Sequence, residues 1–142
     1  MHCRAVARAG EPGAAEVFRD GDAEQPELGH LGEALGRLYA DKHGLRVLHI
    51  RIGNFGDRPL DRRRLSIWLS PRDFLQLVRI GLEHPELHYE TVYGASENDR
   101  TWWDNANAYR LGYRPQDESE PFASEILADD PEPTDLVAEQ FQ

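Results

Sequence analysis

The chain has 142 residues, of which 39% are hydrophobic and 30% charged, a balance typical of one globular domain. The net charge is −10, but residues 116–142 carry nine acidic and no basic side chains, whereas residues 30–115 are nearly balanced. This lack of a basic surplus excludes nucleic-acid binding. No apolar run approaches the roughly 20 residues of a membrane helix, and no signal pattern is present. The single cysteine, Cys3, excludes an internal disulfide, so we expect a cytoplasmic protein.

Residues 1–29 have poor periodicity, and glycine and proline interrupt any helix or strand early. We expect this stretch to be irregular, with at most a helical turn at 14–18. From Leu31 onward, Leu31, Leu35 and Leu38 recur at helical spacing, which predicts a helix over 31–43 that Gly44 ends. Residues 45–52 are short, β-branched and bounded by glycines, so they predict a strand, followed by a polar loop over 53–64.

The segment Ser70-Pro71-Arg72-Asp73 has the capping residues of a helix start, and the helix should end near His84, before Pro85. Residues 91–94 predict a short strand. Residues 101–104 repeat the capping pattern and predict a third helix, which Leu111 and Gly112 close. After Gln116 the chain is acidic and rich in proline, so we expect one helical turn over 122–127 and then a mobile tail.

The order helix, strand, helix, strand, helix favours an α/β fold in which few strands complete the edge of a parallel sheet. Such a unit leaves sheet edges unpaired and part of its core uncovered. Association through an exposed edge or an apolar face is therefore one expected property.

Asn54 is a candidate ligand contact, because ligands of open α/β sheets bind just beyond the carboxyl ends of strands. The alternative is a turn in which Asn and Gly serve the backbone alone. Residues 62–64 are three arginines, which could grip a carboxylate or a phosphate or form a solvated run of charge. His84 and His88 do not predict a metal site, because Pro85 breaks the helical face and no third ligand is evident. Of Trp102 and Trp103, one is expected in the core and the other on a loop or partner, and stacking on a sugar is a further alternative.

Several segments together resemble the extended short-chain dehydrogenase/reductase (NAD-dependent epimerase/dehydratase) family, and more narrowly its uronate dehydrogenases, over His30 to Phe122. The wider family is indicated by Gly32-Glu33-Ala34-Leu35, Leu38-Tyr39-Ala40, His43-Gly44-Leu45 and residues 48–56. The uronate dehydrogenases are indicated by residues 61–63, Trp68-Leu69-Ser70, Asp73-Phe74, residues 92–96, Trp102-Trp103-Asp104-Asn105, residues 111–113 and Pro115-Gln116-Asp117. The resemblance implies a partial Rossmann-type fold, its C-terminal part, with few strands and three main helices. It also implies an oxidoreductase that passes a hydride from a hexuronic acid to NAD and so forms an aldaro-lactone.

Residue by residue, the family's substrate-contacting loop serine falls on Asn54, and the arginine that grips the sugar carboxylate falls on Arg63. The family's catalytic tyrosine and lysine fall on Gln25 and Gly29, so no catalytic residue is assigned. No glycine-rich dinucleotide motif follows a strand, so the residues for NAD stay unknown.

We therefore expect three parts: residues 1–29 without family resemblance, a substrate-side portion over 30–122, and an acidic tail over 123–142. A truncation or frame change upstream of residue 30 is our explanation for the first part, and the chain is expected to be inactive alone. The alternatives are a non-catalytic fragment or pseudoenzyme that acts by association, or an enzyme completed by a separately encoded half.

Overall fold

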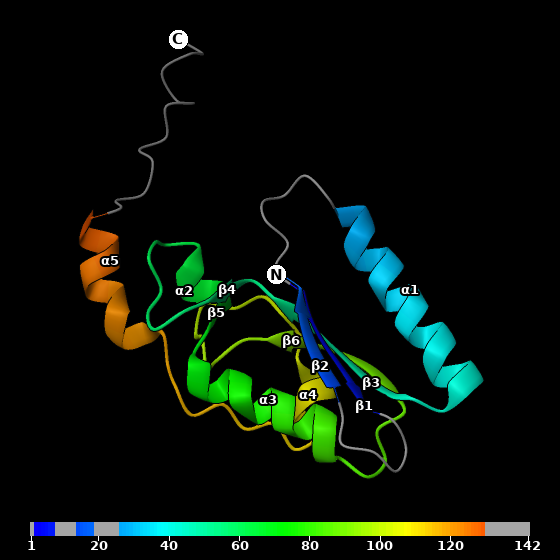
Figure 1. Ribbon diagram of the computed structural model, residues 1–142. Coiled ribbons are helices and arrows are strands. Elements are labelled where there is room, and N and C mark those ends of the chain that lie inside the picture. The colour runs from blue at the N-terminus through cyan, green and yellow to red at the C-terminus, as the bar shows by residue number, and fades with distance from the viewer. Residues whose placement is uncertain (1, 8–13, 19–25, 130–142) are drawn as a thin grey trace.

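A four-stranded sheet lies at the centre of the fold (Figure 1). The computed structural model describes residues 2–7, 14–18 and 26–129, with side chains from residue 29 onward. The strand order is β2 (Ala14–Phe18), β1 (His2–Ala7), β3 (Arg46–Ile52) and β6 (Tyr89–Gly94). β3 and β6 run parallel, whereas β1 is antiparallel to both β2 and β3. The expected α/β class with few parallel strands is confirmed.

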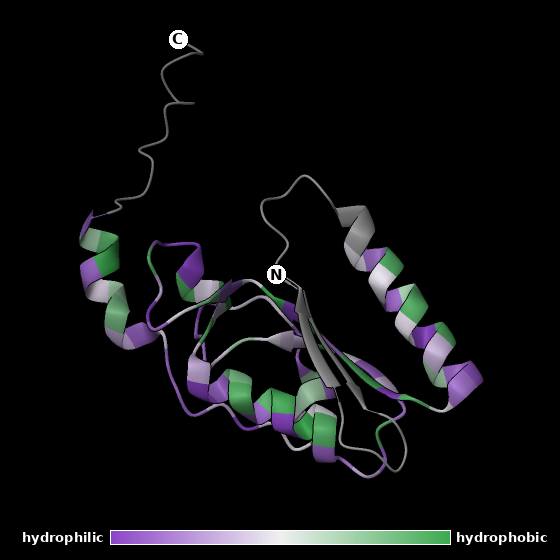
Figure 2. Cartoon of the chain, viewed as in Figure 1, coloured by the Kyte–Doolittle hydropathy of each residue, from purple (hydrophilic) through white to green (hydrophobic). Residues whose placement is uncertain are grey.

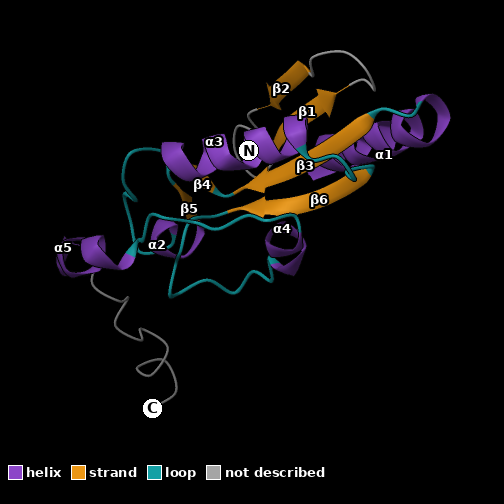
Figure 3. Cartoon of the chain, turned by 90° about the horizontal axis from the view of Figure 1, so that it is seen from below, coloured by secondary structure: helices purple, strands orange, loops and turns teal. Residues whose placement is uncertain are grey.

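Two long helices cover opposite faces of this sheet, α1 (Pro26–His43) and α3 (Pro71–Glu83), as Figures 1 and 3 show. Successive side chains of a strand point to opposite faces. In β3, Leu48, Ile50 and Ile52 therefore pack with Leu77 of α3, while Arg51 reaches Glu33 of α1. α4 (Ala106–Arg110) adds Ala108 to the α3 side. The main buried cluster lies on that side and consists of Leu48, Ile50, Ile52, Leu69, Leu77, Leu87, Val92, Ala108, Leu111 and Tyr113.

The carboxyl ends of β3 and β6 continue into a second, smaller parallel sheet. β4 (Asn54–Phe55) pairs with β5 (Trp68–Leu69), and the short helix α2 (Arg64–Ile67) connects them. Residues 96–98 and 117–119 extend this layer through backbone hydrogen bonds. The loop expected over 53–64 therefore contains a strand. Beyond it, η1 (Glu120–Phe122) and α5 (Ala123–Asp129) supply the helical turn expected near 122–127.

The expectation of an irregular stretch over 1–29 is wrong where the structure describes it. β1 and β2 form a hairpin whose first strand pairs along all of β3, from His2 opposite Arg51 to Ala7 opposite Arg46. The first helix begins at Pro26 rather than Leu31, with a proline in its first turn. Its end is as expected, because Gly44 takes a positive φ of 66°.

The leucines that predict α1 do not face the sheet. Leu31, Leu35 and Leu38 are 63%, 42% and 55% exposed, and α1 meets the sheet through Ala40 and the polar Glu33 instead. Figure 2 shows hydrophobic and hydrophilic residues alternating along the helix. The spacing of the leucines predicts the helix correctly, but the leucine face is not the face that packs on the sheet. No helix among the described residues is long and apolar enough to cross a bilayer.

The third helix begins later than the capping pattern predicts. Residues 101–105 are not helical, and α4 covers only Ala106–Arg110. Thr101 Oγ1 accepts a 3.3 Å bond from the Trp103 amide, and Asp104 Oδ1 accepts a 3.0 Å bond from the Ala106 amide. The expected capping side chains thus form hydrogen bonds within a non-helical segment, and the helix that follows is shorter than expected. Gly112, with a φ of 94°, ends it as expected.

Candidate functional site

Asn54 lies two residues beyond the end of β3, where β4 begins. Its side chain is half-buried, and its Oδ1 is buried without a hydrogen-bond partner among the described residues. A buried carbonyl oxygen without a donor costs free energy, so such atoms mark places where a further donor belongs. The oxygen can accept from a hydroxyl or an amide group, which is the chemistry expected of a sugar contact.

The three arginines have different environments. Asp61 accepts both the Arg64 backbone amide at 2.8 Å and the Arg64 guanidinium at 2.6 Å, which ties Arg64 to the first turn of α2. Arg62 is half-buried. Arg63 is exposed at the N-terminal boundary of α2, and no ion pair engages its side chain within the described part of the chain. Arg63 is therefore the guanidinium of the run that is most available to an anionic ligand.

Asn54 and Arg63 belong to the same β4–α2–β5 unit, but no hydrogen bond joins their side chains within the described residues. Of the catalytic positions that the resemblance implies, Gly29 lies in the first turn of α1 and offers no side chain. Gln25 lies outside the described residues. Asn54 and Arg63 thus lie on one unit, and neither of the positions implied for the catalytic pair supplies a proton-transferring side chain from the described part of the chain.

The family-like segments around Ser70, Asp73 and Asp117 meet in one hydrogen-bond network. The buried Asp73 carboxylate accepts from Ser96 Oγ at 2.6 Å, the Gln116 amide at 2.8 Å and the Asp117 amide at 3.2 Å. The Ser70 amide donates to Ser96 Oγ, and Ser70 Oγ accepts from the Asp73 amide. The network joins the start of α3 to the segments after β6 and before η1, so these residues have a structural role.

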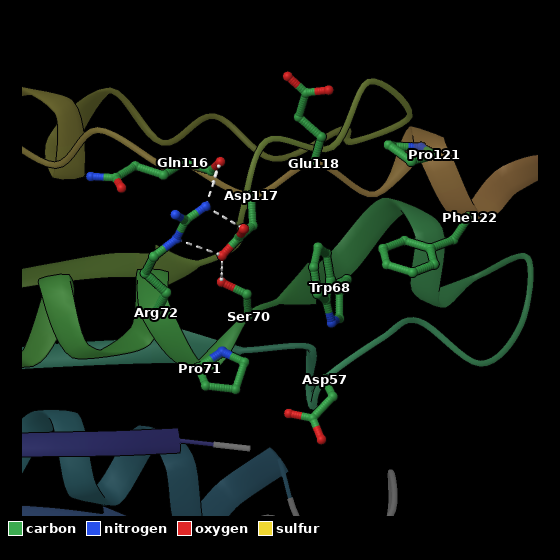
Figure 4. Close-up of a pocket in the computed structure, with 10 residues that line it drawn as sticks. All are labelled: Asp57, Trp68, Ser70, Pro71, Arg72, Gln116, Asp117, Glu118, Pro121 and Phe122. Carbon is green, nitrogen blue, oxygen red and sulfur yellow. Dashed lines mark hydrogen bonds and ion pairs between the residues drawn. The ribbon is translucent and has the colours of Figure 1, made fainter.

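An open cleft of about 540 Å³ lies beside this network (Figure 4). The rings of Trp68 and Phe122 meet edge to face, with their centroids 5.7 Å apart. Arg72 folds onto Asp117 and onto the Gln116 carbonyl, as the dashed lines show, so its charge is already neutralised. Ser70 and Arg72 lower the pKa of the Asp117 carboxyl, the hydroxyl by the stronger effect. The cleft offers no unpaired cation to an acidic ligand among its described lining residues.

The side chains of residues 102–105 have separate roles. The Asn105 side chain accepts from the Tyr93 amide at 3.0 Å and donates to the Tyr93 carbonyl at 2.8 Å, as a neighbouring strand would. It thereby covers the outer edge of β6. Trp103 stacks on Tyr93, whereas Trp102 is 64% exposed. The expectation that one of the two tryptophans lies in the core is therefore wrong, because Trp103 is only half-buried against Tyr93 and Trp102 is exposed.

The described residues do not fit a dinucleotide. A nicotinamide dinucleotide needs a glycine-rich turn that leads from a strand into the N-terminus of a helix. Here β3 leads through Gly53 into β4, and Gly56 lies in the loop beyond it. No step of hydride transfer is therefore assigned to these residues. Among the described side chains there is also no cluster of three or more His, Cys, Asp or Glu that could hold a metal.

No family model matches the chain. A uronate dehydrogenase of Pseudomonas putida is 42% identical over 106 residues, which span 70% of this chain and 40% of the relative. An NAD-dependent glucose-6-phosphate dehydrogenase of Haloferax volcanii is 43% identical over 99 residues, which span 66% of this chain and 37% of the relative.

Solved structures agree with these relatives. A glucuronic acid dehydrogenase from Chromohalobacter salexigens superimposes with a TM-score of 0.71 at 40% identity, over 74% of this chain and 40% of that one. A tyrosine-to-alanine mutant of the Agrobacterium tumefaciens uronate dehydrogenase, in complex with NAD, gives 0.69 at 38% identity, over 75% of this chain and 40% of that one. The partial Rossmann-type fold is thereby confirmed. The chain spans about 40% of the length of the Pseudomonas putida uronate dehydrogenase.

Proposed function

Because the chain is homologous to part of the uronate dehydrogenases, we propose that it forms the uronate-binding portion of an NAD-dependent dehydrogenase and does not turn over substrate alone. The observation that carries the proposal is the unsatisfied, buried Oδ1 of Asn54 at the carboxyl end of β3. A sugar hydroxyl donates to this oxygen. The Arg63 guanidinium, exposed on the same unit, pairs with the sugar carboxylate.

The chemistry of Arg63 also suits a phosphate, and one relative is named for glucose 6-phosphate. We favour the uronate because the uronate relatives match over a larger share of this chain. A binding experiment separates the two. Galacturonate, glucuronate, glucose 6-phosphate and neutral galactose are titrated into the ¹⁵N-labelled chain, and the Asn54 side-chain amide signals are followed. Shifts with the uronates and none with galactose are expected.

The contribution of Arg63 is tested by R63A. Loss of one charge-assisted hydrogen bond should weaken uronate binding at least about tenfold, because such bonds contribute roughly 1.5–3 kcal/mol. The matched control is R79A, which removes an exposed arginine from the solvent side of α3, 3.9 Å from Glu83. Equal affinities for R63A and R79A would show that the arginine run is only a solvated surface.

Two features of the described residues support the proposed inactivity of the chain alone. Gly29 has no side chain to hold a proton, and β3 is not followed by a helix N-terminus for the dinucleotide phosphates. Incubation with NAD and galacturonate or glucuronate should give no absorbance of NADH. Turnover would refute this part of the proposal, and a thermal shift with NAD alone would count against it. Co-expression with a separately encoded cofactor-binding half should restore turnover if such a half exists.

A second candidate function is association without catalysis, and the exposed face of α1 favours it. Leu31, Leu35 and Leu38 form an apolar stripe that no described residue covers. An apolar stripe of this kind is typical of a helix that meets another protein surface. Light scattering on the purified chain tests this function, because replacing Leu35 and Leu38 by lysine should abolish any self-association. The expected cytoplasmic location belongs to the proposal as well, and fractionation of expressing cells would test it.

A further inference from the structure

A column of side chains runs across the α1 side of the sheet, at the carboxyl ends of β3 and β6. Glu33 of α1 holds Arg51 with two hydrogen bonds of 2.7 and 2.8 Å. Arg51 lies opposite Tyr93 in the β3–β6 register, with its guanidinium carbon 6.0 Å from the Tyr93 ring centroid. Tyr93 therefore has a fixed position between the arginine and the residues that follow β6.

Trp103 is the next member of the column. Its indole stacks on the Tyr93 ring with 4.6 Å between centroids and 17° between planes. The side chain of Asn105, two residues later, binds both the amide and the carbonyl of Tyr93, so the segment that carries Trp103 is also fastened to the β6 backbone. Aromatic pairs in such an offset or stacked arrangement stabilise a fold beyond the area that they bury.

The far end of the Trp103 indole lies against the backbone of Gly53. A Cβ placed on Gly53 would lie 2.7 Å from Trp103 Cη2 and 2.6 Å from Ile67 Cβ. Both atoms face the Cβ side of Gly53, so on this side the main chain packs closely against the indole and the end of α2. Asn54, the candidate sugar contact, is the next residue.

We propose that Trp103 is a positioning residue for the uronate site, because its indole, stacked on Tyr93, holds Gly53 and so sets the direction of the Asn54 carboxamide. The inference rests on the proposed function in so far as Asn54 contacts the sugar. Trp103 itself touches no ligand in this scheme. Its neighbour Trp102, exposed and meeting Trp103 only edge to face, has no part in it.

Hydrogen exchange of the loop amides is the first test. In W103A the amides of residues 53–56 should exchange about tenfold faster than in the parent chain, because a contact worth roughly 1.4 kcal/mol is lost. The amides of α3 serve as an internal reference for global stability. W103F keeps a ring on Tyr93 and should restore most of the protection, and W102A should change nothing. Unchanged loop exchange in W103A, with α3 intact, would overturn the inference.

A double-mutant cycle is the second test. W103A and N54A should each weaken galacturonate binding, and the double variant should bind no more weakly than N54A, because Trp103 acts through Asn54. Additive losses would overturn the positioning role. If the parent chain binds no uronate, the proposed function fails, and loop exchange in W103A still decides whether Trp103 positions Gly53 and Asn54.

Discussion

The Ser70 hydroxyl donates a 2.6 Å hydrogen bond to the Asp117 carboxylate, across 47 residues of sequence. The same hydroxyl accepts from the Asp73 amide and so caps α3. One side chain therefore both starts a helix and fastens the segment before η1 to it. Because the hydroxyl donates to the ionised form of Asp117, with Arg72 beside it, the pKa of this carboxyl lies below its usual range.

The stability of the parent chain should depend on the ionisation of Asp117. Since the pKa in the folded chain is lower than in the unfolded chain, the stabilisation is present above the unfolded pKa and disappears as the pH falls through the folded pKa. Thermal unfolding from pH 7 to pH 3 should show a steeper acid loss for the parent than for D117N. The control E118Q alters the adjacent, exposed carboxylate and should follow the parent. Parallel curves for the parent and D117N would contradict the prediction.

Asp73 should be the most sensitive acidic residue of the fold. In D73A, Ser96 Oγ and the amides of Gln116 and Asp117 lose their common acceptor, and unsatisfied buried donors are costly. We expect the free energy of unfolding in urea to fall by about 3 kcal/mol. D99A, at an exposed position after β6, should lose less than about 0.5 kcal/mol. A small effect of D73A would mean that the segment over 115–119 is held by other contacts.

Two glycines should respond to alanine in opposite directions. In G53A the new Cβ would meet Ile67 Cβ and Trp103, and neither can move without disturbing α2 or the stack, so a loss of about 1–3 kcal/mol is expected. Gly32 lies inside α1 with no atom near its Cβ position. G32A should therefore stabilise the chain by about 0.5–1 kcal/mol, since alanine is the better helix former. Urea midpoints of the two variants measure both signs, and a stable G53A would show that the loop backbone has room.

The pair of Glu33 and Arg51 should contribute more than an ordinary surface ion pair. Glu33 is 14% exposed at its side chain and binds Arg51 through both carboxylate oxygens. This contact raises the pKa of Arg51 above its usual value. E33A should lower the unfolding free energy by roughly 1 kcal/mol or more, whereas E83A, whose carboxylate lies 3.9 Å from Arg79 on an exposed face, should change it by less than about 0.5 kcal/mol. Equal effects of the two variants would argue against an anchoring role for Arg51 at the end of β3.

Local signals in the sequence predict the bounds of α3 and of β3 nearly to the residue. Ser70 caps α3 as expected, and β3 spans Arg46–Ile52. The reciprocal half of the capping box does not form, because the Asp73 carboxylate accepts donors from Ser96, Gln116 and Asp117 instead. Those partners lie 23–44 residues away, and no spacing rule along the chain can identify them.

In the candidate site, too, local features could be predicted and contacts between distant segments could not. Position after a strand and family resemblance are sufficient to name Asn54 and Arg63, and their roles stay predictions. The contact between Trp103 and Gly53 had no signal in the sequence, since it depends on how two segments separated by 50 residues pack. Residues 102–105 are one of the motifs on which the family resemblance rests. A motif does not indicate which of its side chains packs against a backbone and which is exposed.

By itself the sequence determined the elements whose signals are local: the ends of α1 and α4 at Gly44 and Gly112, the start of α3 and the strand β3. These depend on the conformations that a few neighbouring residues allow. Only the tertiary structure decided that β1 pairs with β3, that the leucines of α1 face away from the sheet, and that Trp103 lies on the Asn54 loop. Pairing and packing are contacts between distant segments, and their free energy comes from surfaces that meet only once the chain has folded.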